Sequence, residues 1–531
     1  MAFAVALVCV LPLAAVILAA VTGGTETLTH LLESVLWRYS VTTFVLVVSV
    51  AFGTFAIGTG AAWLVVMTDF PGRRMLEIAL VVPLAFPAYV LAYAYTHLLD
   101  HPGIVQASLR LVMGWGPRDY WFPEIRSLGG AILMLILVLY PYVYLLARAS
   151  FLGQGATAFV AARTLGRGPW IAFLRVALPL ARPAIAAGVL LVAMETIADF
   201  GTVSHFSVQT FATGIYTSWF SFGDRAAAAQ LALGLLAFAL LLAMMERFNR
   251  GHARFDAPNL QQGTARMKLT GLNRWGALLL CLIPVFFGAF VPFIALGFMA
   301  FDSEQDLLSA RYLSFLKNSV MLASVAAVVT VTAAIAVGSY FRATRSMPAF
   351  VGMSVARLGY AVPGGVIAVG LLVPFAAFDN MLDGWMRSNF GVGTGLLITG
   401  SIWLLIGAYM IRFLAAAIGA YEGGIASVSQ NMDAAARVLG HSIYGTIRRV
   451  HIPMLTPSLL TAGLIVFVDT MKELPATLIL RPFNFDTLAV QAFHLASDER
   501  LEGAAVPSLV IASVGLVPVI LLCRRVANRR G

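Results

Sequence analysis

The chain has 531 residues, of which 60% are hydrophobic and only 11% charged. Soluble proteins carry about 25% charged residues, so this composition excludes an ordinary soluble protein. The formal charge of +10 resembles that of a nucleic-acid-binding protein. The basic residues, however, lie between long apolar runs, where they set membrane orientation, so no nucleic-acid partner is expected.

The apolar runs predict an all-α integral membrane protein that contacts lipid along most of its length. A helix needs roughly 20 apolar residues to cross the hydrocarbon core. Runs of about that length lie at 2–22, 41–67, 77–98, 128–147, 184–203, 226–246, 275–300, 318–340, 349–377, 395–411, 458–479 and 505–523. The sequence therefore predicts twelve transmembrane helices. A cleavable signal peptide is the alternative interpretation of 2–22, although no Lys or Arg precedes its apolar part.

The distribution of basic residues predicts the orientation. If the first span starts in the cytoplasm, 23 Lys and Arg residues fall in inner segments and 10 in outer segments. Cytoplasmic segments carry such an excess. We therefore expect a multi-pass protein with both termini in the cytoplasm.

A polar, basic stretch at 247–274 separates six spans from six. We interpret it as a cytoplasmic linker between a first repeat, 1–246, and a second repeat, 275–531. Both repeats begin on the same side of the membrane, so they are parallel rather than inverted.

One phrase occurs in both halves. "AARTLGRGPWIAFLRVALPLARP" (161–183) returns as "AARVLGHSIYGTIRRVHIPMLTP" (435–457), with nine of 23 positions identical at a constant offset of 274. Each copy lies between the fourth and fifth span of its half, on the predicted cytoplasmic side. Its Gly allows a tight turn at a helix end, so each copy predicts a short helix on the cytoplasmic surface. Ordinary loops that re-enter the membrane are the alternative.

This phrase resembles the cytoplasmic loop motif of ABC importer permeases. The matching residues are Ala161, Ala162, Gly166, Leu178 and Pro179 in the first half and Ala435, Ala436, Gly440 and Pro453 in the second. The Glu that usually opens the motif is replaced by Val160 and by Ala434, although Asp433 stands one place early. The resemblance implies a type I ABC importer fold and two coupling helices that dock on an ABC ATPase dimer.

The stretches at 198–220 and 471–490 are similar to ferric iron permeases of this family. The resemblance implies a bacterial inner-membrane subunit whose cargo, Fe³⁺ free or chelated, arrives on a periplasmic binding protein. Thiamine or another small solute is an alternative cargo. A secondary transporter of the major facilitator type, which also has parallel repeats, is the alternative from another class, favoured by "DFPGRR" at 69–74.

The chain is not expected to be an enzyme or to hold a cofactor. None of its three lysines follows a glycine, so it has no phosphate-binding loop of the GK[ST] type. ATP is therefore expected on the partner subunit.

Four acidic residues fall inside predicted spans: Glu195, Asp199, Asp469 and Glu473. Within each span the two acids are four residues apart, which would place them on one helical face. Intramembrane carboxylates are costly and mark ion pathways, and hard oxygen ligands suit a small, highly charged cation. We interpret them as a metal translocation path. Structural ion pairs, for example with Lys472, or acids at the wet membrane edge are the alternatives.

Three other polar residues have a predicted role. His441 and His451 lie in the second copy of the repeated phrase, where docking is favoured over metal ligation. Arg357 lies inside the ninth span, where it is expected to snorkel or to pair with an acid.

Overall fold

The computed structural model describes residues 2–250 and 266–528, except Glu304, Leu307, Leu308, Arg345 and Ser427. The centre of the predicted linker therefore lies outside the described residues. The helices before the linker are α1 (Ala2–Thr22), α2 (Thr25–Leu31), α3 (Trp37–Met67), α4 (Arg73–Ala79), α5 (Ala88–Leu99), α6 (Ile104–Met113), α7 (Leu128–Ser150), α8 (Ala156–Thr164), α9 (Pro169–Ala172), α10 (Leu178–Ala198), α11 (Gly201–His205), α12 (Phe211–Tyr216) and α13 (Arg225–Arg250).

The helices after the linker follow the same order. They are α14 (Gly271–Val285), α15 (Val291–Asp302), α16 (Ala310–Thr344), α17 (Met347–Leu358), α18 (Gly364–Phe390), α19 (Ile402–Ile425), α20 (Gln430–Val438), α21 (Ile443–Thr446), α22 (Ile452–Met471), α23 (Pro475–Leu480), α24 (Leu488–Ser497) and α25 (Leu501–Asn528). Short π or 3₁₀ segments are η1 (Leu32–Leu36), η2 (Val82–Ala85), η3 (Phe151–Gly155), η4 (Phe173–Ala177), η5 (Thr217–Ser221), η6 (Phe286–Phe290), η7 (Gly359–Ala361) and η8 (Ile447–His451). Two short strands, β1 (Thr68–Asp69) and β2 (Met267–Lys268), pair in parallel.

The described residues contain 11 helices long and apolar enough to cross a membrane, or 12 if one bent pair counts as a span. The bent pair, Arg73–Ala85 and Ala88–Met113, turns by 92° and corresponds to the predicted span 77–98. Its break falls at Pro87, and the break between α17 and α18 falls at Pro363; each proline precedes the helix it caps. Proline lacks the N–H that would continue a helix, so the matched prolines account for the matched breaks.

The matched order of elements is consistent with the predicted duplication. The pairs α4 and α17, α7 and α19, and α10 and α22 each begin 274 residues apart, as do the π segments η4 and η8. The predicted all-α membrane fold is therefore confirmed apart from the one short strand pair, and the two-repeat arrangement is consistent with it.

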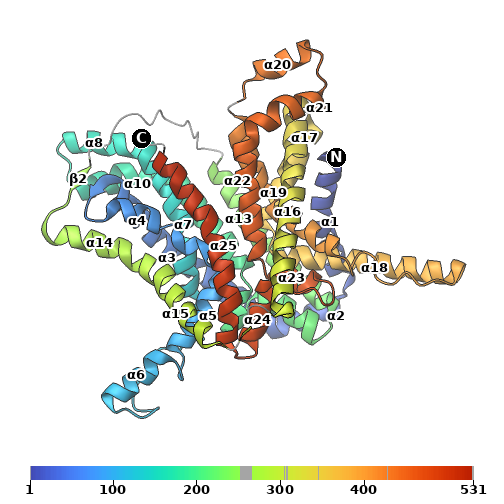
Figure 1. The fold of residues 1–531 in the computed structure, drawn as a ribbon, viewed down its shortest axis with the longest axis horizontal. Coiled ribbons are helices and arrows are strands. Elements are labelled where there is room, and N and C mark those ends of the chain that lie inside the picture. The colour runs from blue at the N-terminus through green and yellow to red at the C-terminus, as the bar shows by residue number, and fades with distance from the viewer. Residues whose placement is uncertain are drawn as a thin grey trace. The chain divides into compact units, whose positions relative to one another are not determined.

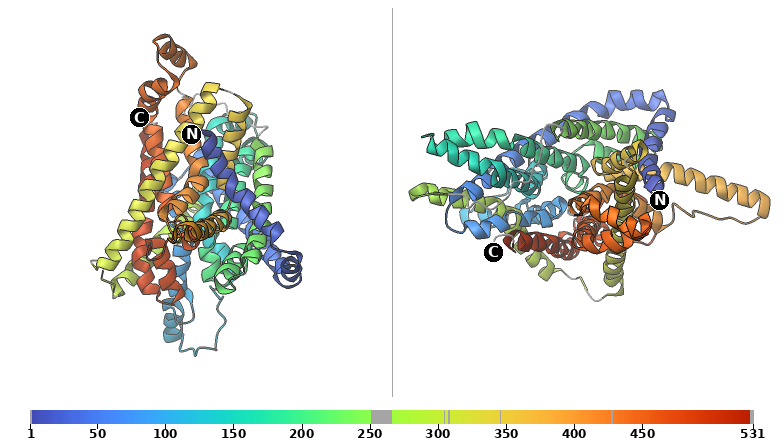
Figure 2. Two further views of the ribbon diagram at one scale, coloured as in Figure 1. Left: turned by 90° about the vertical axis from the view of Figure 1, so that its right-hand side faces the viewer. Right: turned by 90° about the horizontal axis from the view of Figure 1, so that it is seen from above.

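One compact unit comprises residues 1–37, 211–240 and 306–491. Its centre is a bundle in which α16, α19 and α22 lie side by side, and α18 extends away from that bundle (Figures 1 and 2). Helix α1 packs against α17 and α18, where Gly370 lies directly against the backbone of Pro12. The first helix of the chain thus completes a unit built mainly from the second half.

The other compact unit comprises residues 38–210, 241–305 and 492–531. It contains α7 packed against α10, and it takes α14, α15 and α25 from the second half. The hydroxyl of Tyr95 on α5 donates a hydrogen bond of 2.7 Å to the carbonyl of Phe287 in η6. The exchange of helices is therefore reciprocal, and the division at 247–274 stays a prediction about the sequence repeats.

Charged side chains pair within each unit, buried in one and exposed in the other. Glu77 on α4 accepts hydrogen bonds from Arg73 and from Arg148 on α7. On the matched elements of the other unit, Arg357 of α17 pairs with Glu422 of α19. The pairing predicted as one alternative for Arg357 is confirmed.

Candidate functional site

Each copy of the repeated phrase forms a helical hairpin with the same turn. Gly166 follows α8, and Gly440 stands between α20 and α21; both have a φ of +80°. The next residue donates its N–H back across the turn, from Arg167 to Ala162 O at 3.1 Å and from His441 to Ala436 O at 3.0 Å. This is the Schellman ending of a helix, which favours glycine because the left-handed region strains other residues.

The motif residues divide into inward and outward positions. Ala162 and Ala436 are buried, whereas Ala161, Ala435, both turn glycines and Pro453 are exposed. Leu178 and Pro179 are half-buried at the start of α10. The second Ala of each copy therefore packs against its own unit, and the first faces outward.

Large apolar side chains are exposed on both hairpins. They are Leu165, Trp170 and Ile171 in the first and Val438, Leu439, Ile443 and Tyr444 in the second. Clustered exposed apolar groups mark interaction surfaces. Each hairpin thus exposes an apolar surface.

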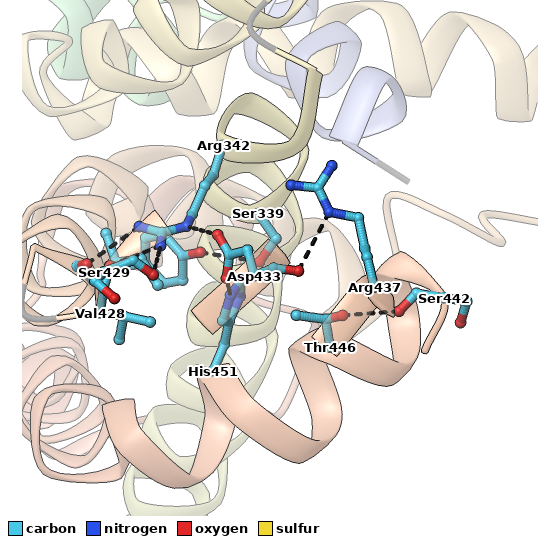
Figure 3. A network of polar contacts seen from close by, with 11 residues as sticks. Ser339, Arg342, Val428, Ser429, Asp433, Arg437, Ser442, Thr446 and His451 are labelled. Carbon is cyan, nitrogen blue, oxygen red and sulfur yellow. Dashed lines mark hydrogen bonds and ion pairs between the residues drawn. The ribbon is translucent and has the colours of Figure 1, made fainter. Parts of the chain in front are cut away.

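The second hairpin is held by a charged network centred on Asp433 of α20 (Figure 3). Arg342 on α16 donates from Nε to Asp433 at 2.7 Å, and His451 Nε2 lies 2.7 Å from the other carboxylate oxygen. Arg342 also donates to Val428 O at 2.7 Å. Burial disfavours the ionised carboxylate, but the hydrogen bonds from His451 and Arg342 outweigh it and hold the pKa of Asp433 below its usual value.

This network changes the interpretation of His451 and Asp433. His451 is buried and faces Asp433, so the predicted docking role does not fit its position. Asp433 faces its own bundle rather than outward.

Aromatic contacts hold the first hairpin instead. Trp63 on α3 lies 5.4 Å from Trp170 on α9 and 4.8 Å from Phe173 in η4, measured between ring centroids. Phe151 lies 6.2 Å from Phe173. The two hairpins share a backbone turn but are anchored by different chemistry.

The acids of the first half do not share a helical face. Helix α10 ends at Ala198, and Asp199 is extended, with a φ of −68° and a ψ of 129°. Its carboxylate accepts hydrogen bonds from the N–H groups of Thr202 and Val203, both at 3.2 Å. Asp199 thus caps α11, and the prediction of one continuous face with Glu195 is wrong because the helix stops between them.

The second half repeats this arrangement. Helix α22 ends at Met471, and Glu473 accepts from the N–H groups of Ala476 and Thr477 at 3.0 and 3.1 Å. Arg412 Nη1 lies 3.8 Å from Glu473.

Asp469 is paired with Lys472 at 2.9 Å. The predicted alternative of a structural ion pair is therefore realised for this acid.

Within the described residues, no group of three or more His, Cys, Asp or Glu is arranged to hold a metal ion. The apolar pattern of the sequence did not predict that Asp199 and Glu473 cap helices, because apolar residues continue past the ends of α10 and α22. The available signal was a Thr three or four residues after each acid, with Gly201 or Pro475 between.

Sequence relatives cover most of the chain, whereas no family model matches it. The Fe(3+)-transport system permease protein FbpB 2 of Haemophilus influenzae is 26% identical over 494 residues, covering 90% of this chain and 88% of the relative. The ferric transport system permease protein FbpB of Actinobacillus pleuropneumoniae is 26% identical over 506 residues, covering 90% and 69%.

A shorter relative matches part of the chain. The molybdenum transport system permease protein ModB of Escherichia coli is 28% identical over 218 residues, which is 39% of this chain and 89% of ModB. A solved bacterial ABC transporter involved in import of the polysaccharide alginate covers 48% of this chain and 94% of its own, at 16% identity and a TM-score of 0.38.

These relatives are transport components and not enzymes. Their similarity extends across both sequence halves, and this chain carries the motif hairpin in each half on a scaffold of membrane-spanning helices. The chain is therefore similar, over about nine-tenths of its length, to permease subunits of ferric iron transport systems.

Proposed function

We propose that this permease carries ferric iron across a bacterial inner membrane, received from a periplasmic binding protein. The iron permeases of Haemophilus and Actinobacillus, related over about nine-tenths of this chain, support that cargo. The single observation that carries the mechanism is the pair of hairpins with identical Schellman turns and exposed apolar side chains.

The two hairpins are the coupling helices. They face the cytoplasm together with both termini, in agreement with the excess of Lys and Arg in the predicted inner segments. Each docks on one subunit of an ATPase dimer, because one chain supplies both permease halves. Closure of that dimer on ATP drives alternating access, and hydrolysis resets it.

Co-purification with the ATPase tests the coupling helices. Leu439→Asp with Tyr444→Asp places charge on the exposed apolar surface of the second hairpin, so the ATPase should be lost from the purified complex. Phe483→Asp, at an exposed apolar residue between α23 and α24, is the control and should retain it. Retention of the ATPase by the hairpin variant would overturn the docking role.

In this proposal the two acids of each repeat are cation ligands of the path within their own unit. Glu195 and Asp469 lie on the last turns of α10 and α22, and Asp199 and Glu473 lie at the breaks that follow. A carboxylate oxygen that caps a helix keeps further lone pairs, so capping leaves a cation ligand available. The path is a series of weak sites, since an ion must also leave each one.

Uptake of labelled iron into vesicles that contain the whole importer tests the path. The double variant Glu195→Gln with Asp469→Asn should insert normally and lose most uptake and stimulated ATPase activity. Glu33→Gln, which changes an exposed acid, is the matched control and should transport normally. Normal uptake by the double variant would remove these acids from the path.

A further inference from the structure

Helix α18 is buried at its start and exposed at its end. Residues from Gly364 to Leu371 are buried against neighbours that include α1 and α23, whereas most residues from 377 to 397 are exposed. Pro374 lies where the burial ends. The outer part of α18 therefore extends beyond its bundle, as both views of this unit show (Figures 1 and 2).

The extension is a built hairpin rather than a frayed end. Asp379 is buried although it lies on the extension, and it accepts hydrogen bonds from the N–H groups of Ile398 and Thr399, at 3.1 and 2.8 Å. Asp383 accepts from Gly395 N at 2.8 Å. These bonds fold the segment after Gly391, which has a φ of +68°, back along α18.

The surface of this hairpin is apolar and aromatic. Its exposed large side chains are Phe378, Met381, Trp385, Phe390, Val392, Leu396 and Leu397. Its charged groups are partnered within the hairpin, because Asp383 pairs with Arg387 at 2.6 Å and Asp379 accepts hydrogen bonds from backbone N–H groups. An exposed apolar segment with paired charges and a Trp suits the membrane interface, where amphipathic aromatic rings concentrate.

We propose that residues 372–400 form a paddle, named here for its shape, that lies along the bilayer and binds lipid. The occupant follows from continuity: the paddle extends sideways from α16, α19 and α22, which cross the membrane, so the surface that surrounds its base is already lipid. The side of the membrane follows from the proposed function, which places α20 and α21 in the cytoplasm. The paddle lies toward the other end of α16 and therefore in the outer leaflet.

Lipid quenching of a fluorophore tests the paddle. Met381→Cys and Trp385→Cys are each labelled with a solvent-sensitive fluorophore in the full chain, reconstituted in phosphatidylcholine vesicles, with Cys9, Cys281 and Cys523 replaced by Ala. The probes should show blue-shifted emission and loss of emission with spin-labelled phosphatidylcholine, and little loss with aqueous iodide. Phe483→Cys, on an exposed loop, is the control and should show the reverse.

Two outcomes would overturn the proposal. Quenching of both paddle probes by iodide would mean that water covers the surface. Quenching by neither agent, with cross-linking between copies of the chain, would mean that a second copy covers it. A second variant, Asp379→Asn, keeps the side-chain volume and weakens the fold of the hairpin. It should raise iodide quenching at position 385, and unchanged quenching would also count against a folded paddle. None of these fluorescence measurements depends on iron transport, so the paddle proposal and the proposed cargo can be disproved independently.

Discussion

Asp433 joins elements that are far apart in the sequence. It lies on α20 and binds Arg342 of α16 and His451 at the start of α22. All three side chains are mostly buried, with at most 17% of any side chain exposed. One carboxylate therefore ties α20 to two long helices, α16 and α22.

We predict that Asp433→Asn weakens this anchor without unfolding the membrane domain. A hydrogen bond to a charged partner contributes about 1.5–3 kcal/mol, and the amide retains one acceptor oxygen but no charge. Limited proteolysis should cut α20 faster, and ATPase activity should respond less to cargo. Arg437→Gln, at an exposed residue whose side chain donates to the backbone carbonyl of Asp433, is the control, and an equal effect there would refute the anchor.

The same anchor should depend on pH in a defined direction. Because the pKa of Asp433 lies below its ordinary value of 3.8, its stabilising contribution is complete above that value. It is lost as the pH falls through the lowered pKa. Proteolysis of α20 should therefore be constant from neutral pH to about pH 4 and accelerate only in stronger acid, and in Asp433→Asn this acid step should be absent.

At the scale of elements, the two hairpins formed by the repeated phrase depend on their glycine turns. Gly166 and Gly440 have positive φ, and an added Cβ at either position would meet no atom within 4 Å. Any cost of substitution therefore comes from the backbone conformation alone. That cost is about 1–2 kcal/mol for a non-glycine residue in the left-handed region.

We predict that Gly440→Ala and Gly166→Ala each reduce cargo-stimulated ATPase activity and leave expression unchanged, because the strain falls on the hairpin alone. Gly168→Ala is the matched control, since Gly168 lies two residues beyond Gly166 with an ordinary φ of −59° and equally open surroundings. Comparable loss in the control would show that the turn conformation is not what coupling requires.

Elements near the site were partly predictable from sequence. The apolar runs and the duplicated phrase predicted the spans and the glycine turns, because both signals are local. The breaks after Ala198 and Met471 were not predicted, because a hydropathy window averages over a break whose far side is also apolar. The partners of His451 and Arg357 lie on other helices, and nothing in the local sequence specifies them.

At the scale of the whole molecule, each sequence half completes the unit built on the other. Helix α1 packs against α17 and α18 in one unit, and α15 packs against α5 and α25 in the other. Smaller contacts follow the same rule: the Tyr216 hydroxyl donates to the carbonyl of Pro475, and the ring of Phe493 lies 5.6 Å from that of Phe200. Hydrophobic periodicity shows that a helix is apolar but not which half covers it, so this exchange was outside the reach of sequence analysis.

We predict that residues 1–258 and 259–531, produced together as two chains, assemble and co-purify, because the exchanged helices bury apolar surface in both units. Either chain produced alone should be degraded, since each leaves the other's surface uncovered. Size-exclusion chromatography of the co-expressed chains in detergent is the measurement. Stable, monodisperse single halves would contradict the interlocking of the units.

Fusion also frees the two copies to diverge. Two identical subunits must change together, because one gene encodes both, whereas covalent repeats accumulate separate substitutions. Arg412 approaches Glu473, while the position 274 residues earlier is Val138; the hairpin anchors are likewise ionic in one copy and aromatic in the other. The two repeats of a single polypeptide can thus take different roles. Because they are translated as one chain, they are always made in equal numbers.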